Sequence, residues 1–155
     1  MTAPARDIWF LGGLLQLRAT GEETGGAYTL VEELLPAGYA APMHVHTREE
    51  EAFLVLEGEI TFWIGEETTV LRAGDYLNLV REVPHGFRVT SAGPTHAIMI
   101  AAPAGLEGFF RAGGEPAAEA AIPPPAEGPP DLSKLSAAAE EFGLLLLGPP
   151  PETGG

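Results

Sequence analysis

Three histidines and one glutamate stand in this chain at intervals that suit a metal ion. His44, His46 and Glu51 lie in one short stretch, and His85 follows in a separate segment. Imidazole and carboxylate are the usual ligands of Fe, Mn, Co, Ni, Cu or Zn where thiolate is absent, and the chain contains no cysteine. The pattern predicts one divalent transition metal ion as cofactor, and these ligand types do not choose among the metals.

The spacing of the four residues favours ligands that converge from several β-strands. Side chains two residues apart in a strand share a face, so His44 and His46 point the same way. Glu51 has the wrong parity for that strand, so a turn must separate it from the histidines. His85 opens a distant strand. A small barrel brings side chains from such strands to one interior point.

Two neighbouring groups are expected to play ordinary structural roles. His96 has nothing near it in the sequence that completes a ligand set, and a lone histidine is more often structural than a ligand. The acidic run that ends at Glu51 also contains Glu49 and Glu50, and such runs are usually solvated loops.

The elements that must position these residues are short strands. Between residues 7 and 103, runs rich in Val, Ile, Leu, Thr and aromatic residues are separated by Gly, Pro and acidic turns, without a helical period. An all-β body is therefore expected over residues 1–112. Its expected strands are 14–20, 27–35, 51–58, 59–65, 68–74, 76–80, 86–90 and 96–102.

The composition changes after residue 103. Residues 105–111 predict a short helix whose two phenylalanines pack on the barrel, and 113–130 reads as a Pro/Ala-rich linker. Residues 131–155 are expected to pack on the barrel as a helix, an apolar run and a tail. Capping is expected from Asp131 and Gly143, and a buried helix face from Leu132, Leu135 and Phe142.

The charge and hydropathy of the chain argue against nucleic acid and membranes as its partners. The formal net charge of −14 disfavours binding to nucleic acid or to anionic lipid. No run approaches the roughly 18 apolar residues of a membrane span, and the apolar stretch 8–15 is too short and too close to charges for a secretory signal. We expect a cytoplasmic protein whose partner is a small molecule, with no nucleic acid and no membrane.

The first motif resembles a known family. Gly38-x5-His44-x-His46-x4-Glu51-x6-Gly58 matches the first conserved motif of the cupin superfamily at every signature position. The motifs cover residues 38–89, and the flanking strand pattern extends the resemblance over roughly residues 7–103.

A second stretch, Gly74-x5-Val80-x-Glu82-x2-His85, resembles the second cupin motif. The family has proline at the position of Val80, glycine at that of Glu82 and asparagine at that of Val89. These departures concern turn conformation and pocket shape, and they leave the number of ligands intact.

The resemblance implies a double-stranded β-helix, or jelly roll, with a short C-terminal helical extension and the metal near one mouth of the barrel. It implies His44, His46, Glu51 and His85 as ligands, with Glu50 as the rival carboxylate because the family tolerates a shift of one residue. A homodimer is implied because cupins frequently pair through their sheets. The C-terminal part is loosely similar to single-domain cupins of the quercetin-dioxygenase-like group, which implies a catalytic role for Glu51 as proton acceptor.

Aromatic side chains suggest a substrate pocket beside the ligands. Phe53 and Phe87 each lie two residues from a predicted ligand on the same face, and Tyr76 is a further candidate. The leading hypothesis is a metal-dependent dioxygenase acting on a small enolisable or flavonol-like aromatic substrate. The alternatives are a non-redox, metal-dependent isomerase and a small-molecule-binding module without catalysis.

Overall fold

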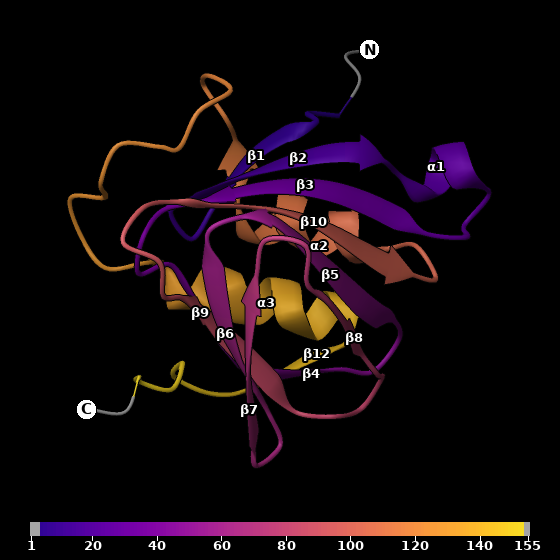
Figure 1. The fold of residues 1–155 in the computed structure, drawn as a ribbon. Helices are drawn as coiled ribbons and strands as arrows, with labels where there is room; N and C mark the ends of the chain where they lie inside the picture. Colours follow the sequence, from indigo (N-terminus) through magenta and orange to yellow (C-terminus); the bar gives the residue numbers. More distant parts are fainter. Residues whose placement is uncertain (1–3, 154–155) are drawn as a thin grey trace.

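Two antiparallel sheets form the body of the protein. The computed structural model describes residues 4–153, and the sheets lie face to face in it (Figure 1). The larger sheet consists, in order, of β11 (Glu115–Pro116), β1 (Asp7–Phe10), β2 (Gly13–Ala19), β3 (Thr29–Leu35), β10 (Thr95–Ala102), β5 (Glu50–Glu57) and β8 (Tyr76–Leu79). The smaller sheet consists of β12 (Leu144–Gly148), β4 (Ala40–His46), β9 (His85–Val89), β6 (Glu59–Ile64) and β7 (Glu67–Arg72). This confirms the predicted all-β jelly roll.

Alternation of side chains builds the core between the sheets. Every second residue of β3, from Thr29 to Leu35, is buried, while those between are half-exposed. In β10 the residues that pair with this buried set face the same interior. Burying one face of each strand in this way fixes the register, because a slip of one residue would turn the apolar side chains toward water.

Two turns of the backbone show what is required at one position in each of the two cupin-like motifs. Gly58 has a φ of +95°, and a Cβ at this position would collide with Thr95, so glycine is required there. Glu82 has a φ of +65° and is not glycine. Its backbone N–H donates to the carbonyl oxygen of His46 at 2.9 Å. The left-handed turn is therefore kept at Glu82, although the side chain makes this conformation costly.

Three helices accompany the sheets among the described residues: α1 (Gly21–Thr24), α2 (Leu106–Gly113) and α3 (Leu132–Phe142). The predicted short helix is confirmed as α2, and its Phe109 and Phe110 rings meet Phe10 edge-on, with centroids 5.4 and 5.2 Å apart. Helix α2 also packs against α3.

The C-terminal helix α3 begins and ends where its capping residues predict. The Asp131 side chain accepts a hydrogen bond from the backbone N–H of Lys134, and Gly143 is left-handed, with a φ of +76°. Leu135 is buried, but the prediction that Leu132 is buried is wrong, since it is 66% exposed. It is the first residue of the helix, where the chain enters from the irregular segment.

The last strand, β12, extends the smaller sheet beside β4. Leu144 pairs with His46 and Leu146 with His44, so the apolar run that was expected to pack on the barrel is a strand of the sheet. The segment before α3 is largely irregular, and Trp9 Nε1 donates to the carbonyl of Ala121 at 2.8 Å. None of the helices in residues 4–153 is long and apolar enough to cross a membrane.

Candidate metal centre

Four buried side chains from three strands converge inside the barrel. His44 and His46 come from β4, Glu51 from β5 and His85 from β9. The pairing of β4 with β9 places His44 opposite His85, and His46 is the last residue of β4 before the chain turns into β5. The ligand atoms of all four lie within 4.8 Å of one another. The structure thus brings together the whole set that the sequence singled out.

Hydrogen bonds on the outer side of each ring orient the three imidazoles. Nδ1 of His44 lies 2.6 Å from the carbonyl oxygen of Pro42, and Nδ1 of His85 lies 3.3 Å from that of Val83. Nδ1 of His46 lies 2.7 Å from Glu49 Oε1. Because a carbonyl or carboxylate oxygen can only accept, each Nδ1 carries the proton. Each Nε2 is then left with a lone pair that faces the other two rings.

The spacing of the donor atoms fits one first-row metal ion. Nε2 of His44 and Nε2 of His46 are 3.1 Å apart, while Glu51 oxygens lie 3.5 Å from His46 Nε2 and 3.4 Å from His85 Nε2. Donors held about 2.1 Å from one ion at adjacent positions are roughly 3.0–3.5 Å apart. His85 Nε2 is buried and has no hydrogen-bond partner among residues 4–153. A cation would satisfy this lone pair.

The charges of the cluster favour a cation as well. Burial opposes ionisation of Glu51, but the surrounding imidazoles, His46 first, outweigh it and lower the pKa of Glu51 to about 2. Burial and the neighbouring rings of His85 and His46 lower the pKa of His44 to about 3. Burial also opposes charge on His46, but Glu51 and Glu49 outweigh it and raise the pKa of His46. Because a metal binds only the neutral imidazole, metal binding would compete with protonation of His46.

Two acidic neighbours of Glu51 have opposite surroundings. Glu49 was expected in a solvated loop, but it is buried, because its carboxylate accepts the hydrogen bond from His46. Glu50 is exposed at the start of β5 and faces away from the cluster. The carboxylate that joins the histidines is therefore that of Glu51, and the rival Glu50 is excluded by the alternation along the strand.

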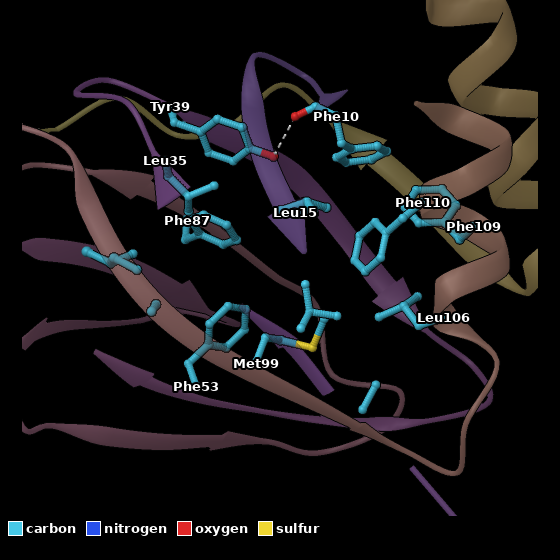
Figure 2. Close-up of a cluster of buried hydrophobic side chains, with 14 of the residues drawn as sticks. Phe10, Leu15, Leu35, Tyr39, Phe53, Phe87, Met99, Leu106, Phe109 and Phe110 are labelled. Carbon is cyan, nitrogen blue, oxygen red and sulfur yellow. Dashed lines mark hydrogen bonds between the residues drawn. The ribbon is translucent and has the colours of Figure 1, made fainter. Parts of the chain in front are cut away.

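An apolar cavity adjoins the cluster. It has a volume of about 50 Å³ and is lined by His44, His46 and Glu51 together with a largely apolar wall. Figure 2 shows how side chains from both sheets and from α2 surround this space. The wall residues in that view are Phe10, Leu15, Tyr39, Phe53, Phe87, Met99, Leu106, Phe109 and Phe110.

The predicted pocket residues divide between the inside and the outside of the barrel. Phe53 and Phe87 line the cavity, with ring centroids 5.6 Å apart. The prediction for Tyr76 is wrong, since its side chain is 65% exposed. It pairs with Leu54, which is also on the outer face, whereas the next residue along β8 pairs with Phe53. Its place in the register therefore points Tyr76 into solvent.

One polar residue of the cavity wall was not singled out in the sequence. Glu33 of β3 is 4% exposed and lines the cavity. Burial, together with the charge of Glu51, raises the pKa of Glu33 to about 8. Strict alternation along residues 29–35, in which Thr29, Val31 and Leu35 are buried, is the sequence signal that places Glu33 inside.

The C-terminal elements supply part of the same wall. Leu135 of α3 and both Leu144 and Leu146 of β12 line the cavity. Leu146 is only half-buried, as are Leu11 in the β1–β2 turn and Pro42 in β4. Together with Ala41, which is also half-buried, these are the lining residues that reach nearest the surface.

Comparison with known proteins identifies relatives of part of the chain. Residues 30–101 match the model of the cupin domain. A quercetin 2,3-dioxygenase of Bacillus subtilis (strain 168) is 36% identical over 73 residues, which are 47% of this chain and 22% of that protein. A quercetin 2,3-dioxygenase of Aspergillus japonicus is 29% identical over 104 residues, 63% of this chain and 29% of that protein. This chain spans less than a third of the length of either relative.

Solved structures share the architecture. A predicted oxalate decarboxylase from Thermotoga maritima superposes with a TM-score of 0.57 at 20% identity, over 64% of this chain and 91% of the other. KdgF from Halomonas sp. superposes with a TM-score of 0.56 at 18% identity, over 62% of this chain and 83% of the other. At such low identity, the similarity shows the fold alone.

Proposed function

We propose that this chain, which belongs to the cupin superfamily, is a metal-dependent dioxygenase acting on a small enolisable substrate. The observation that carries the proposal is the arrangement of the three imidazoles. Their Nδ1 atoms donate hydrogen bonds to oxygens outside the cluster, and their Nε2 atoms face one another. Beside them lie a carboxylate and an apolar cavity. The similarity to two quercetin 2,3-dioxygenases supports oxygen chemistry for this donor set.

His44, His46, Glu51 and His85 would hold the metal. A divalent transition metal in this position supplies Lewis acidity toward an enol or hydroxyl group and, if it is redox-active, one-electron chemistry with O₂. The hydrogen bonds at the Nδ1 atoms would support metal binding. They fix the orientation of the three rings and keep the Nε2 atoms directed toward the metal position.

Glu51 is suited to move a proton as well as to bind. Its two oxygens lie near different histidines, Oε2 near His46 and Oε1 near His85. Its carboxylate also lines the cavity, so it is placed to accept the acidic proton of an enolisable substrate. The apolar wall excludes water from this step.

The cavity limits the size of the substrate. A volume of about 50 Å³ has room for only a few water molecules, which need about 10–15 Å³ each. A three-ring flavonol exceeds this space unless the wall around Leu11, Pro42 and Leu146 moves. We therefore favour a small diketone-like or single-ring molecule over a flavonol as the substrate.

Oxygen uptake tests the proposal. Protein loaded separately with Fe, Mn, Co, Ni or Cu is incubated with acetylacetone, a small enolisable diketone, and with quercetin. We expect O₂ consumption with the diketone, faster than with quercetin, and its loss in His85→Ala but not in His96→Ala. Absence of O₂ uptake with every metal and both compounds would count against a dioxygenase.

The same assay separates the alternative functions. Conversion of the diketone without O₂ would favour a non-redox enzyme that uses the metal only as a Lewis acid. Thermal stabilisation by the diketone without any conversion would favour a binding module.

A further inference from the structure

A second carboxyl group shares the cavity with Glu51. Glu33 is 4% exposed, and its Oε1 atom is buried without a hydrogen-bond partner among residues 4–153. Buried polar atoms are normally paired, because an unpaired one loses its hydration without compensation. The carboxyl group of Glu33 thus lies in the cavity wall, and no residue in the described part of the chain forms a hydrogen bond with its Oε1 atom.

The register places Glu33 along the cavity from the candidate metal ligands. Glu51 pairs with Ala101 of β10, whereas Glu33 pairs with Ala97 of the same strand. The two glutamates therefore stand on opposite sides of β10, four residues apart along it. Both carboxyl groups project from the same inner face of the larger sheet. A molecule that extends from Glu51 along this face approaches Glu33 with its other end.

The neighbours of Glu33 leave its carboxyl group free for a ligand. Its partners across the two adjacent strands are Leu15 and Ala97, both apolar and buried. The nearby hydroxyl of Tyr39 donates to the carbonyl oxygen of Phe10 at 3.3 Å (Figure 2), so its proton is already used. The raised pKa favours the protonated form of Glu33, which can both donate and accept a hydrogen bond.

We propose that Glu33 anchors the substrate by a hydrogen bond to a hydroxyl or carbonyl group at the end remote from the metal ligands. The proposal rests on the proposed function, since it assumes a ligand whose first end lies at His44, His46, Glu51 and His85. It narrows the substrate class to small molecules with a polar group at each end and an apolar middle.

Matched hydroxamates test this anchor without requiring turnover. In the Zn²⁺-loaded protein, ω-hydroxyalkyl hydroxamates of increasing chain length, from glycolohydroxamate upward, are compared with alkyl hydroxamates that carry a methyl group in place of the hydroxyl. The hydroxamate group binds the metal end in both series, so the ratio of their Kd values reports only the remote hydroxyl. Titration calorimetry on the wild type, Glu33→Met and Glu33→Gln gives this ratio.

We expect the wild type to prefer the hydroxyl compound at one chain length by about tenfold more than Glu33→Met does, which corresponds to one hydrogen bond. Glu33→Gln should keep part of this preference, because an amide also donates and accepts. Glu33→Met should also raise the Tm by about 4 °C, since it removes an unpaired buried carboxyl group. A purely structural role for Glu33 predicts the reverse, a lower Tm with unchanged selectivity.

Equal selectivity in the wild type and Glu33→Met at every chain length would overturn the proposal, and so would failure of both series to bind the wild type. Failure of the proposed function is recognised separately. A protein that takes up no Zn²⁺ overturns both proposals, and a protein that binds hydroxamates with the Glu33-dependent preference but consumes no O₂ retains the anchor and loses only the dioxygenase.

Discussion

The carboxylate of Glu49 accepts a hydrogen bond from Nδ1 of His46 at 2.7 Å, and both side chains are buried. Glu49 holds the imidazole in the tautomer and orientation that turns Nε2 toward the other ligands. It also makes that nitrogen more basic, as a carboxylate behind a metal-bound histidine does. If the centre holds a metal, its affinity would therefore depend on a residue that does not itself face the metal position.

Replacing Glu49 is expected to weaken metal binding without abolishing it. Glu49→Gln should raise the Kd for Zn²⁺ or Co²⁺ by about 10- to 100-fold, because the amide is a weaker acceptor for His46. Competition with a chromogenic chelator measures this Kd. Glu50→Gln is the matched control, since it removes the same charge from the exposed adjacent residue. If both substitutions raise the Kd equally, the change is due to net charge alone.

Replacing single histidines should show which of them bind the metal. His85→Ala is expected to lower the metal content of purified protein well below one ion per chain, because the site loses a donor from a distant strand. His96→Ala should leave the content unchanged, since His96 Nε2 lies 2.7 Å from Glu32 on the outside of the larger sheet. Elemental analysis decides, and metal loss in His96→Ala would contradict the assignment.

The left-handed turn at Glu82 predicts a stabilising substitution. Glu82→Gly should increase the free energy of unfolding by about 1 kcal/mol, because glycine adopts the φ of +65° without the steric cost borne by a side chain. Urea denaturation of the metal-free protein measures the change. Glu82→Ala, which keeps a Cβ, is the control and should give little gain. A destabilised Glu82→Gly would show that the side chain, rather than the turn, matters.

Stability at low pH should depend on Glu107. Burial opposes its ionisation, but hydrogen bonds from the N–H groups of Gly21 and Gly105 and from the Thr29 hydroxyl outweigh burial and lower its pKa. A folded pKa below the unfolded value of 4.5 contributes stability above pH 4.5, which is lost as pH falls through the folded pKa.

Glu107→Gln should therefore cost about 1–3 kcal/mol at pH 7 and progressively less below pH 4.5. Urea midpoints collected from pH 7 downward on both proteins give this difference. A difference that stays constant with pH would mean that the ionised form has no special role.

Leu144 is expected to matter for both stability and cavity size. Leu144→Ala should cost about 2–4 kcal/mol of unfolding free energy, because the side chain is 5% exposed and lines the cavity. Leu145→Ala is the matched control, since the next residue of β12 is 54% exposed. Chemical denaturation compares the two. If both cost the same, β12 contributes through its backbone pairing and not through the Leu144 side chain.

Sequence patterns predicted most of the fold because strands of the larger sheet, such as β3 and β10, bury alternate residues. The same parity brought His44 and His46 to one face and required a turn before Glu51, as the structure has it. Tyr76 was misplaced because its direction depends on the register with β5, which one strand of four residues does not reveal.

The acids behind and beside the centre were harder to predict. Glu49 lies in an acidic run, and such runs normally face water, whereas here one member is buried by its hydrogen bond to His46. Glu33 is buried although carboxylates rarely are. The size of the cavity depends on α2, α3 and β12 together, and such packing is not encoded in any local pattern.

The pairing of β12 with β4 sets the order in which the centre is completed during synthesis. His46 pairs with Leu144, and His44 with Leu146, so nearly a hundred residues must leave the ribosome after the histidines before their strand acquires this neighbour. Contacts of such long sequence separation carry a loop-closure cost and slow folding. The part of the cavity wall that β12 forms therefore closes only after Leu144–Gly148 have been synthesised, whereas the four candidate ligands all lie between residues 44 and 85.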